Sequence, residues 1–221
     1  TVAEHTFTLL LSLCKNLLPQ PNDCAHGLWN RRTGHEIFGK RILILGMGRI
    51  GKEVAIRARA FGMEVTGYNR SWDDSFAQTH QVSRITDIES ALPQTDIVSL
   101  HLPFTESTHN LINPDRLALL PKGAFVINTG RGELVNARAV VDALESGHLG
   151  GYGADVLEQE PPPANHPLLG APRCVITPHV GSRTYESVAR QAEMAARNLI
   201  LALSGKKPLA QANNAPLPTP V

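Results

Sequence analysis

Three ionisable residues in this 221-residue chain have the side chains needed to reduce a keto group: Arg131, Glu160 and His179. An arginine can bind a carboxylate through charge-assisted hydrogen bonds and polarise a neighbouring carbonyl. A histidine can donate the proton, and a carboxylate beside the histidine can keep it charged. Together these residue types predict hydride transfer to an α-keto acid, with the hydride supplied by a bound carrier.

A glycine-rich turn, Gly46-Met47-Gly48-Arg49-Ile50-Gly51, predicts the binding site for that carrier. It follows an apolar strand predicted over residues 41–45 and opens a predicted helix. In this setting the first glycine makes a tight turn, the second lets a pyrophosphate approach, and the third packs the helix on the strand. The pattern indicates dinucleotide binding; the alternative, a structural turn in another doubly wound protein, leaves the later motifs unexplained.

The residues after the second predicted strand bear on the type of dinucleotide. Asn69 stands where an NAD-selecting Asp or Glu is usual, and Arg70 and Ser71 follow it. No carboxylate is present there to repel a 2′-phosphate, and Arg70 with Ser71 can bind one. NADP is therefore favoured over NAD. The alternative is that Arg70 is solvated or stacks on adenine, while Asn69 binds the ribose of NAD.

The elements that must position these residues alternate between strand and helix. This alternation of strands and helices predicts an α/β fold with a doubly wound parallel sheet of the Rossmann type. The expected strands are residues 41–45, 65–68, 97–100, 124–127, 151–154 and 175–177, and the expected helices are 50–61, 87–92, 114–119, 136–145 and 184–203. A first helix begins with a capping box at Thr1 and Glu4, continues its apolar pattern to Leu18, and is ended by Pro19 and Pro21.

Composition argues against several classes of function. The formal net charge is +1 and acidic and basic residues are interspersed, so neither nucleic acid nor an acidic membrane surface is an expected partner. No apolar run is long enough to span a bilayer. Cys14, Cys24 and Cys174 match no zinc-binding spacing and are expected to be reduced thiols, so we expect no metal site and a cytoplasmic location.

Several motifs occur together in a fixed order. They are Val2-Ala3-Glu4, Leu102-Pro103-Phe104-Thr105, Asn128-Thr129-Gly130-Arg131-Gly132, Asp155-Val156-Leu157-Glu158-Gln159-Glu160-Pro161 and Thr177-Pro178-His179-Val180-Gly181. With this set, the chain from Thr1 to about Lys207 resembles the D-isomer-specific 2-hydroxyacid dehydrogenases.

The resemblance implies a role for each matching residue. Arg131 would bind the substrate carboxylate and carbonyl, His179 would act as acid and base, and Glu160 would pair with His179. Asp155 would hold the nicotinamide carboxamide. The residues implied to meet the pyrophosphate or line the cofactor are Arg49, Ile50, Leu102, Pro103, Thr108, Thr129, Gly130 and Gly181. Taken singly, Arg131 could be a helix cap, Glu160 a solvated acid and His179 a turn residue. The remaining candidates, His5, His101, His109, His148 and His166, match no catalytic motif and are expected to be surface or packing residues.

The resemblance also implies a domain layout. Members of the family carry a long segment before the helix that opens this chain, and that segment forms most of the substrate domain. We therefore expect a fragment or a shortened form in which the catalytic residues border an open cleft. The expected parts are a connecting helix (1–20), a dinucleotide-binding domain (21–183), a helix returning to the substrate domain (184–207) and a disordered tail (208–221). No regulatory domain is expected after Lys207.

Three functional classes are consistent with this reading. The first is a 2-hydroxyacid dehydrogenase acting on glyoxylate or hydroxypyruvate, with 3-phosphoglycerate and D-lactate as the next candidates. The second is a dinucleotide-binding scaffold, and the third is a catalytically incomplete fragment that serves in oligomerisation. The family resemblance further implies a homodimer formed through the nucleotide-binding domain, with the segment around Trp29 contributing.

Overall fold

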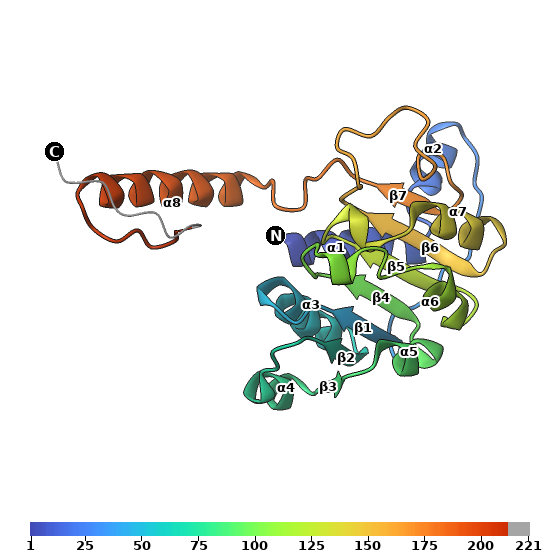
Figure 1. Cartoon of the computed structure of the whole chain (residues 1–221). Helices are drawn as coiled ribbons and strands as arrows, with labels where there is room; N and C mark the ends of the chain where they lie inside the picture. Colours follow the sequence, from blue (N-terminus) through green and yellow to red (C-terminus); the bar gives the residue numbers. More distant parts are fainter. Residues whose placement is uncertain (212–221) are drawn as a thin grey trace. The chain divides into compact units, whose positions relative to one another are not determined.

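The computed structural model describes residues 1–211 and divides the chain into two compact units. One unit comprises Val2–Gly181, and the other comprises Thr1 with the chain from Ser182 onward. The larger unit is a seven-stranded sheet in which every pairing is parallel, in the order β3-β2-β1-β4-β5-β6-β7 (Figure 1). The predicted doubly wound α/β fold is confirmed.

Six of the seven strands lie where the sequence predicts them, with ends that differ by at most two residues. They are β1 (Arg41–Leu45), β2 (Glu64–Tyr68), β4 (Ile97–Leu100), β5 (Ala124–Asn128), β6 (Leu149–Ala154) and β7 (Cys174–Ile176). The seventh, β3 (Val82–Ile85), is an edge strand that the sequence analysis missed. Two of its four residues are exposed, so it has no apolar run to mark it.

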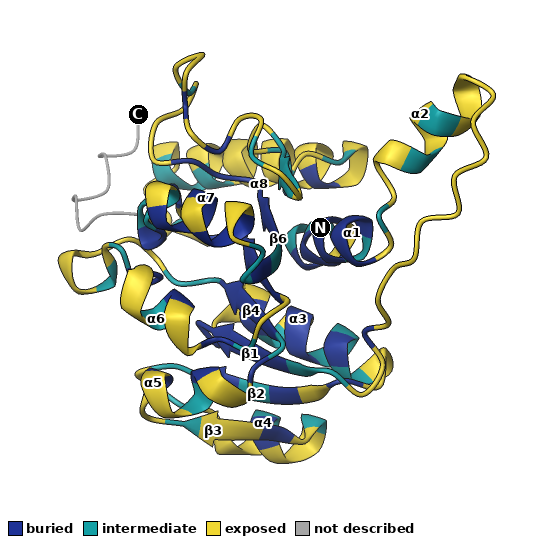
Figure 2. Cartoon of the chain, turned by 90° about the vertical axis from the view of Figure 1, so that its right-hand side faces the viewer, coloured by how far each residue is buried: buried dark blue, intermediate teal, exposed yellow. Residues whose placement is uncertain are grey.

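Helices cover both faces of the sheet. On one face α1 (Val2–Cys14), α3 (Arg49–Ala60) and α4 (Asp74–His80) enclose a core that includes Leu10, Ile44 and Val54. On the other face α5 (Ile88–Ala91), α6 (Pro114–Leu119) and α7 (Ala137–Glu145) enclose a second core around Leu100 and Val140. Figure 2 shows the central strands β1 and β4 as a buried layer between these helices, and the edge strand β3 as largely exposed. Helix α4 was not predicted, although Asp73 caps it by accepting from the Phe76 N–H.

The start of the chain differs from the prediction in two respects. Helix α1 ends at Cys14, and Leu17 and Leu18, which were assigned to its apolar pattern, are exposed. Pro19 and Pro21 do not end the first helix, as was predicted; they lie in the first turn of a short second one, α2 (Pro19–Ala25). Proline is tolerated there because the first N–H groups of a helix have no partner within the helix.

The smaller unit contains α8 (Tyr185–Leu203), which matches the predicted helix over residues 184–203 to within one residue; Thr184 is its N-cap and Ser204 its C-cap. Leu199, Ile200 and Leu203 on this helix are exposed. Residues 208–211 form neither helix nor strand. The remainder of the predicted tail, 212–221, lies outside the described residues.

The three cysteines are free thiols. Burial raises the pKa of Cys14 to about 11 and that of Cys174 to about 12, so both are protonated at neutral pH. Among residues 1–211 there is no group of three or more His, Cys, Asp or Glu side chains arranged to hold a metal ion. Over the same residues, the helices are too short or too polar to cross a bilayer.

Candidate active site at the carboxyl edge of the sheet

The predicted site residues gather at one edge of the sheet because all the strands run in the same direction. The register places Leu45 opposite Tyr68 and Leu100, Leu100 opposite Asn128, Asn128 opposite Ala154, and Ala154 opposite Ile176. The residues that come next therefore follow strand ends at one level: Gly46, Asn69, His101, Thr129, Asp155 and Thr177. In open α/β sheets this carboxyl edge is where ligands bind.

The glycine turn has the geometry that a pyrophosphate needs. Gly46 has a φ of 107°, and a Cβ there would lie 2.7 Å from the carbonyl of His101. A Cβ on Gly51 would lie 1.9 Å from the Gly46 oxygen, so only glycine lets helix α3 pack this closely. A Cβ on Gly48 would meet nothing within 4 Å. Gly48 is also the N-cap of α3, and neither it nor Arg49 or Ile50 is buried, so the open helix N-terminus is available to an anion.

The loop after β2 carries the residues predicted to select the dinucleotide. Asn69 Nδ2 donates to the carbonyl of Ser71 at 2.5 Å and lies 3.3 Å from its hydroxyl, so these two residues order the loop. Arg70 is exposed and forms no ion pair with any residue in the described part of the chain. The next acid along the chain, Asp73, is paired with Lys52 at 2.5 Å. Its negative charge is thereby offset near this loop.

The loop after β4 forms the neighbouring wall. Thr108 closes it by donating to the Pro103 carbonyl and accepting from the Thr105 N–H, at 3.0 and 2.8 Å. Pro103 is exposed and Leu102 partly buried. His101, at the strand end, hydrogen-bonds Ser99 Oγ through Nε2 at 2.8 Å and Thr129 Oγ1 through Nδ1 at 3.3 Å. Burial lowers the pKa of His101 to about 4, so its imidazole is neutral at neutral pH.

Arg131 is positioned by a buried asparagine at the end of β5. The Asn128 side chain accepts from the Gly130 N–H at 3.0 Å and donates to the Arg131 carbonyl at 2.8 Å. The Arg131 guanidinium is exposed, and its one hydrogen bond to the described residues goes to the Gly130 carbonyl at 2.7 Å. In the described part of the chain it forms no ion pair with Glu160 and no hydrogen bond with His179. An exposed cation at this edge can bind an anionic ligand.

His179 and Glu160 are brought together from the loops after β7 and β6. His179 Nδ1 lies 2.7 Å from Glu160 Oε2, while Glu160 Oε1 accepts from the Leu157 N–H at 3.1 Å. Both side chains are partly exposed, at 51% and 38%. Since the carboxylate oxygen is an acceptor, His179 donates through Nδ1, which leaves Nε2 to exchange a proton with a ligand.

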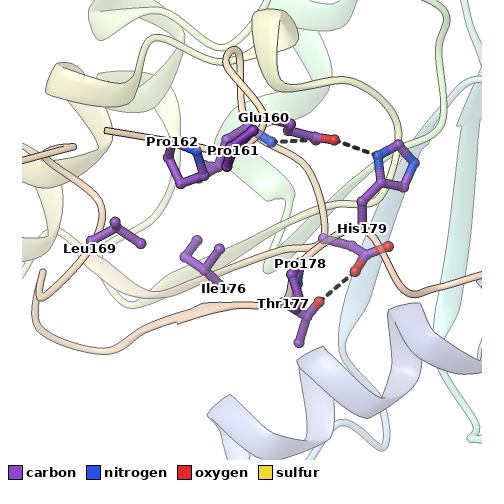
Figure 3. Close-up of a pocket in the computed structure, with 10 residues that line it drawn as sticks. Glu160, Pro161, Pro162, Leu169, Ile176, Thr177, Pro178 and His179 are labelled. Carbon is purple, nitrogen blue, oxygen red and sulfur yellow. Dashed lines mark hydrogen bonds and ion pairs between the residues drawn. The ribbon is translucent and has the colours of Figure 1, made fainter. Parts of the chain in front are cut away.

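A cavity of about 410 Å³ lies beside this pair. Its walls are mostly apolar and include Leu157, Pro161, Leu169 and Ile176, and Asp155 and Thr177 also line it. Figure 3 shows the His179 ring and the Glu160 carboxylate facing one another at one end, with Leu169 and Ile176 at the other. The His179–Glu160 pair therefore borders a cavity with mostly apolar walls.

Asp155 is the buried carboxylate of the site, with an exposed fraction of 3%. Its Oδ1 accepts from the Val180 N–H at 2.9 Å, and its Oδ2 accepts from the Gly181 N–H at 2.7 Å. A Cβ on Gly181 would lie only 2.8 Å from Oδ2, which accounts for the glycine.

The structure adds residues that the sequence reasoning did not assign to the site. Asn128 orders the arginine loop, His101 hydrogen-bonds Thr129, and Thr177 donates to Asp155. Asn128 and Thr177 lie inside quoted motifs, so their proximity to Arg131 and His179 in sequence was the available signal. His101 matched no motif, but its place directly after a buried strand was a signal of the same kind.

The fold is that of a dinucleotide-binding domain, with a hydrogen-bonded histidine–carboxylate pair at the carboxyl edge of its sheet. The profile of the family described as D-isomer specific 2-hydroxyacid dehydrogenase, NAD binding domain, matches residues 7–181. The chain therefore belongs to this family.

Three similar proteins illustrate the range of the family. A glyoxylate reductase of Thermofilum pendens is 40% identical over 220 residues, covering 96% of this chain and 64% of the relative. The structure of an acyclic imino acid reductase in complex with NADPH and D-Arg matches with a TM-score of 0.83 and 29% identity, over 93% of this chain and 66% of that one. A D-lactate dehydrogenase from Aquifex aeolicus, complexed with NAD and lactic acid, matches with a TM-score of 0.84 and 29% identity, over 92% and 66%. This chain thus spans about 64% of the length of its curated relative.

Proposed function

We propose that this chain carries the cofactor-binding and acid–base part of an NAD(P)-dependent D-2-hydroxyacid dehydrogenase that transfers a hydride to a small 2-keto acid. The observation that carries the proposal is the 2.7 Å hydrogen bond between His179 and Glu160, at the same sheet edge as the glycine turn. Glyoxylate and hydroxypyruvate are the first substrates to test, because the glyoxylate reductase of Thermofilum pendens is 40% identical.

The residues present fit a nicotinamide dinucleotide. The space beside Gly48 and the exposed N-terminus of α3 accept a pyrophosphate, and Asp155 offers an acceptor for the carboxamide. When bound, the dinucleotide supplies the hydride. Arg131 neutralises the substrate carboxylate and polarises the keto oxygen. His179 donates a proton to that oxygen from Nε2, and Glu160 stabilises the protonated imidazole through Nδ1.

We further propose a preference for NADP over NAD. Arg70 is exposed and has no carboxylate partner in the described part of the chain, and position 69 holds no acid. A 2′-phosphate on the adenosine ribose would gain charge-assisted hydrogen bonds from Arg70 and Ser71. Solved relatives bind either dinucleotide, so the loop of this chain has to be tested directly.

The test is a fluorescence titration of the chain with NADPH and NADH in parallel. We expect NADPH to bind at least about tenfold more tightly, which corresponds to roughly 1.4 kcal/mol. Arg70→Gln should weaken NADPH binding and leave NADH binding unchanged. Arg138→Gln, which removes an exposed arginine from α7, is the matched control and should change neither. Tighter binding of NADH would reject the NADP preference, and binding of neither would reject the proposed function.

We also propose that the chain forms a homodimer through this domain. The segment over residues 28–37 contains neither helix nor strand; Trp29 lies within it and Phe38 follows it, and both aromatic side chains are exposed, at 79% and 75%. Large exposed apolar side chains are candidates for a protein interface. Sedimentation analysis should give a dimer that Trp29→Ala weakens, whereas a monomeric wild-type chain would contradict the proposal.

We also propose a cytoplasmic location, because the three cysteines are free thiols and cysteines stay reduced in the cytoplasm.

A further inference from the structure

The carboxylate of Asp155 is contacted by a side chain of helix α1 as well as by the backbone N–H groups of Val180 and Gly181. Thr177 Oγ1 lies 2.6 Å from Asp155 Oδ1, and His5 Nε2 lies 2.8 Å from Thr177 Oγ1 and 3.3 Å from Asp155 Oδ1. His5 and Thr177 are 172 residues apart in sequence. The first helix of the chain thus reaches the carboxyl edge of β6 and β7.

The donors and acceptors in this chain of contacts can be assigned. The short contact to Asp155 Oδ1 uses the single hydroxyl proton of Thr177, because a carboxylate oxygen only accepts. Thr177 Oγ1 must then accept from His5, so the His5 proton lies on Nε2. The relay runs from His5 through Thr177 to Asp155.

The two oxygens of Asp155 are unequally occupied. Oδ1 meets Thr177, the Val180 N–H and His5, whereas Oδ2 accepts only from the Gly181 N–H among the described residues. A carboxylate oxygen has room for a second donor. Oδ2 can therefore receive an amide N–H from a ligand without losing any of the contacts that hold the carboxylate in place.

Helix α1 is a rigid support for this relay. Phe7, Leu9, Leu10 and Leu13 are buried in the core between α1, α3 and the sheet, which fixes the helix against β5 and β6. Thr6, which follows His5 on the helix, also contacts the sheet: its Oγ1 lies 3.0 Å from Thr129 Oγ1, just after β5. The His5 side chain itself is 17% exposed and that of Asp155 is 4% exposed.

We propose that His5 is a positioning residue for the nicotinamide end of the cofactor: through Thr177 it orients Asp155 so that Oδ2 faces the carboxamide. The inference rests on the proposed function, since it requires a nicotinamide dinucleotide at this edge. It assigns a role to a histidine on the opening helix, far from the glycine turn. If His5 served only to stabilise the fold, its replacement would not weaken binding selectively at one end of the ligand.

Selectivity for one end of the ligand provides the test. The dissociation constants of the preferred dinucleotide and of its ADP-ribose moiety, which lacks the nicotinamide ring, are measured for the wild-type chain and its variants. His5→Ala should weaken dinucleotide binding at least about fivefold and leave ADP-ribose binding within twofold, because only the dinucleotide uses Asp155. His5→Gln keeps a side-chain N–H and should recover part of the loss.

Thr177→Val keeps the shape of the side chain, removes the middle of the relay and should show the same selectivity. The loss in the His5→Ala, Thr177→Val double variant should be smaller than the sum of the single losses. Thr8→Ala, on the exposed side of α1, is the control and should change neither constant. Thermal melts identify any variant that fails to fold, and in that case His5→Gln and Thr177→Val carry the test.

Equal weakening of both ligands, or no change in either, would overturn the inference and leave the proposed function standing. Wild-type protein that binds neither ligand would overturn the proposed function, and the inference with it.

Discussion

The two halves of the carboxyl edge are built in different ways. At β1 and the start of α3 the site is made by backbone: Gly46 and Gly51 allow chain segments to approach so closely that a single Cβ would collide with a carbonyl. At β5, β6 and β7 it is made by side chains: Asn128 hydrogen-bonds within the loop after its own strand, and Asp155 and Thr177 link the loops after β6 and β7.

The difference concerns what each half can tolerate. A backbone cradle depends on the absence of atoms, so adding one methyl group is the damaging change. A side-chain network depends on donors and acceptors, so removing or exchanging one polar atom is the damaging change. Substitutions can therefore separate the fold of each half from its chemistry.

The largest effect is expected in the side-chain half, at the exposed end of the network. His179→Gln removes the proton donor, so the rate of keto-acid reduction should fall by about 100-fold or more, while dinucleotide affinity stays within twofold. The rate is followed as the loss of reduced-nicotinamide absorbance in single turnovers with glyoxylate. A fully active His179→Gln protein would reject the assignment of His179 as the acid.

Glu160→Gln should lose activity by a smaller factor. The amide nitrogen of the new side chain would donate to Nδ1, and the stabilisation of the protonated imidazole would be lost. The same loop offers a matched control, because His166 and Glu158 form a second histidine–carboxylate pair at 3.0 Å. Glu158→Gln should keep the reduction rate near that of the wild type, since His166 is buried and lies outside the cavity lining.

Much of the side-chain half could be predicted only in outline. Arg131, Glu160 and His179 were grouped by their residue types and by the family resemblance, and the parallel sheet was predicted from its apolar strands. The hydrogen-bond partners of His5 and His101 could not be predicted, because they are set by the packing of α1 and by the order of the strands. Among the elements, β3 lacked an apolar pattern and α2 contained two prolines, so local composition pointed away from both.

A third prediction concerns the backbone half and separates folding from binding. Gly51→Ala places a methyl group 1.9 Å from the Gly46 oxygen and should reduce the free energy of unfolding by about 3 kcal/mol. Gly48→Ala meets no atom within 4 Å and should change stability by less than about 0.5 kcal/mol. It should still weaken dinucleotide binding, because the methyl group occupies the space predicted for the pyrophosphate. Denaturant titration and ligand titration measure the two effects, and equal stability of the two variants would contradict the close packing of Gly51.

The smallest effect at neutral pH is expected where the two halves meet, at His101 after β4. Burial lowers the pKa of His101 to about 4 from an ordinary value of 6.5. Between these values the unfolded chain binds more protons than the folded chain, so the stabilising contribution is complete above about pH 6.5 and is lost as the pH falls towards 4.

Ser99 and Thr129, which contact the two ring nitrogens, are uncharged and offer the imidazolium no compensating carboxylate. The wild-type unfolding free energy should therefore fall more steeply than that of His101→Gln, by up to about 1.4 kcal/mol per pH unit in this window. Urea titrations at a series of pH values measure the difference between the two curves, which removes the contributions of the other histidines. Parallel curves would show that His101 is protonated in the folded chain, and hence that the junction between the two halves is open to water.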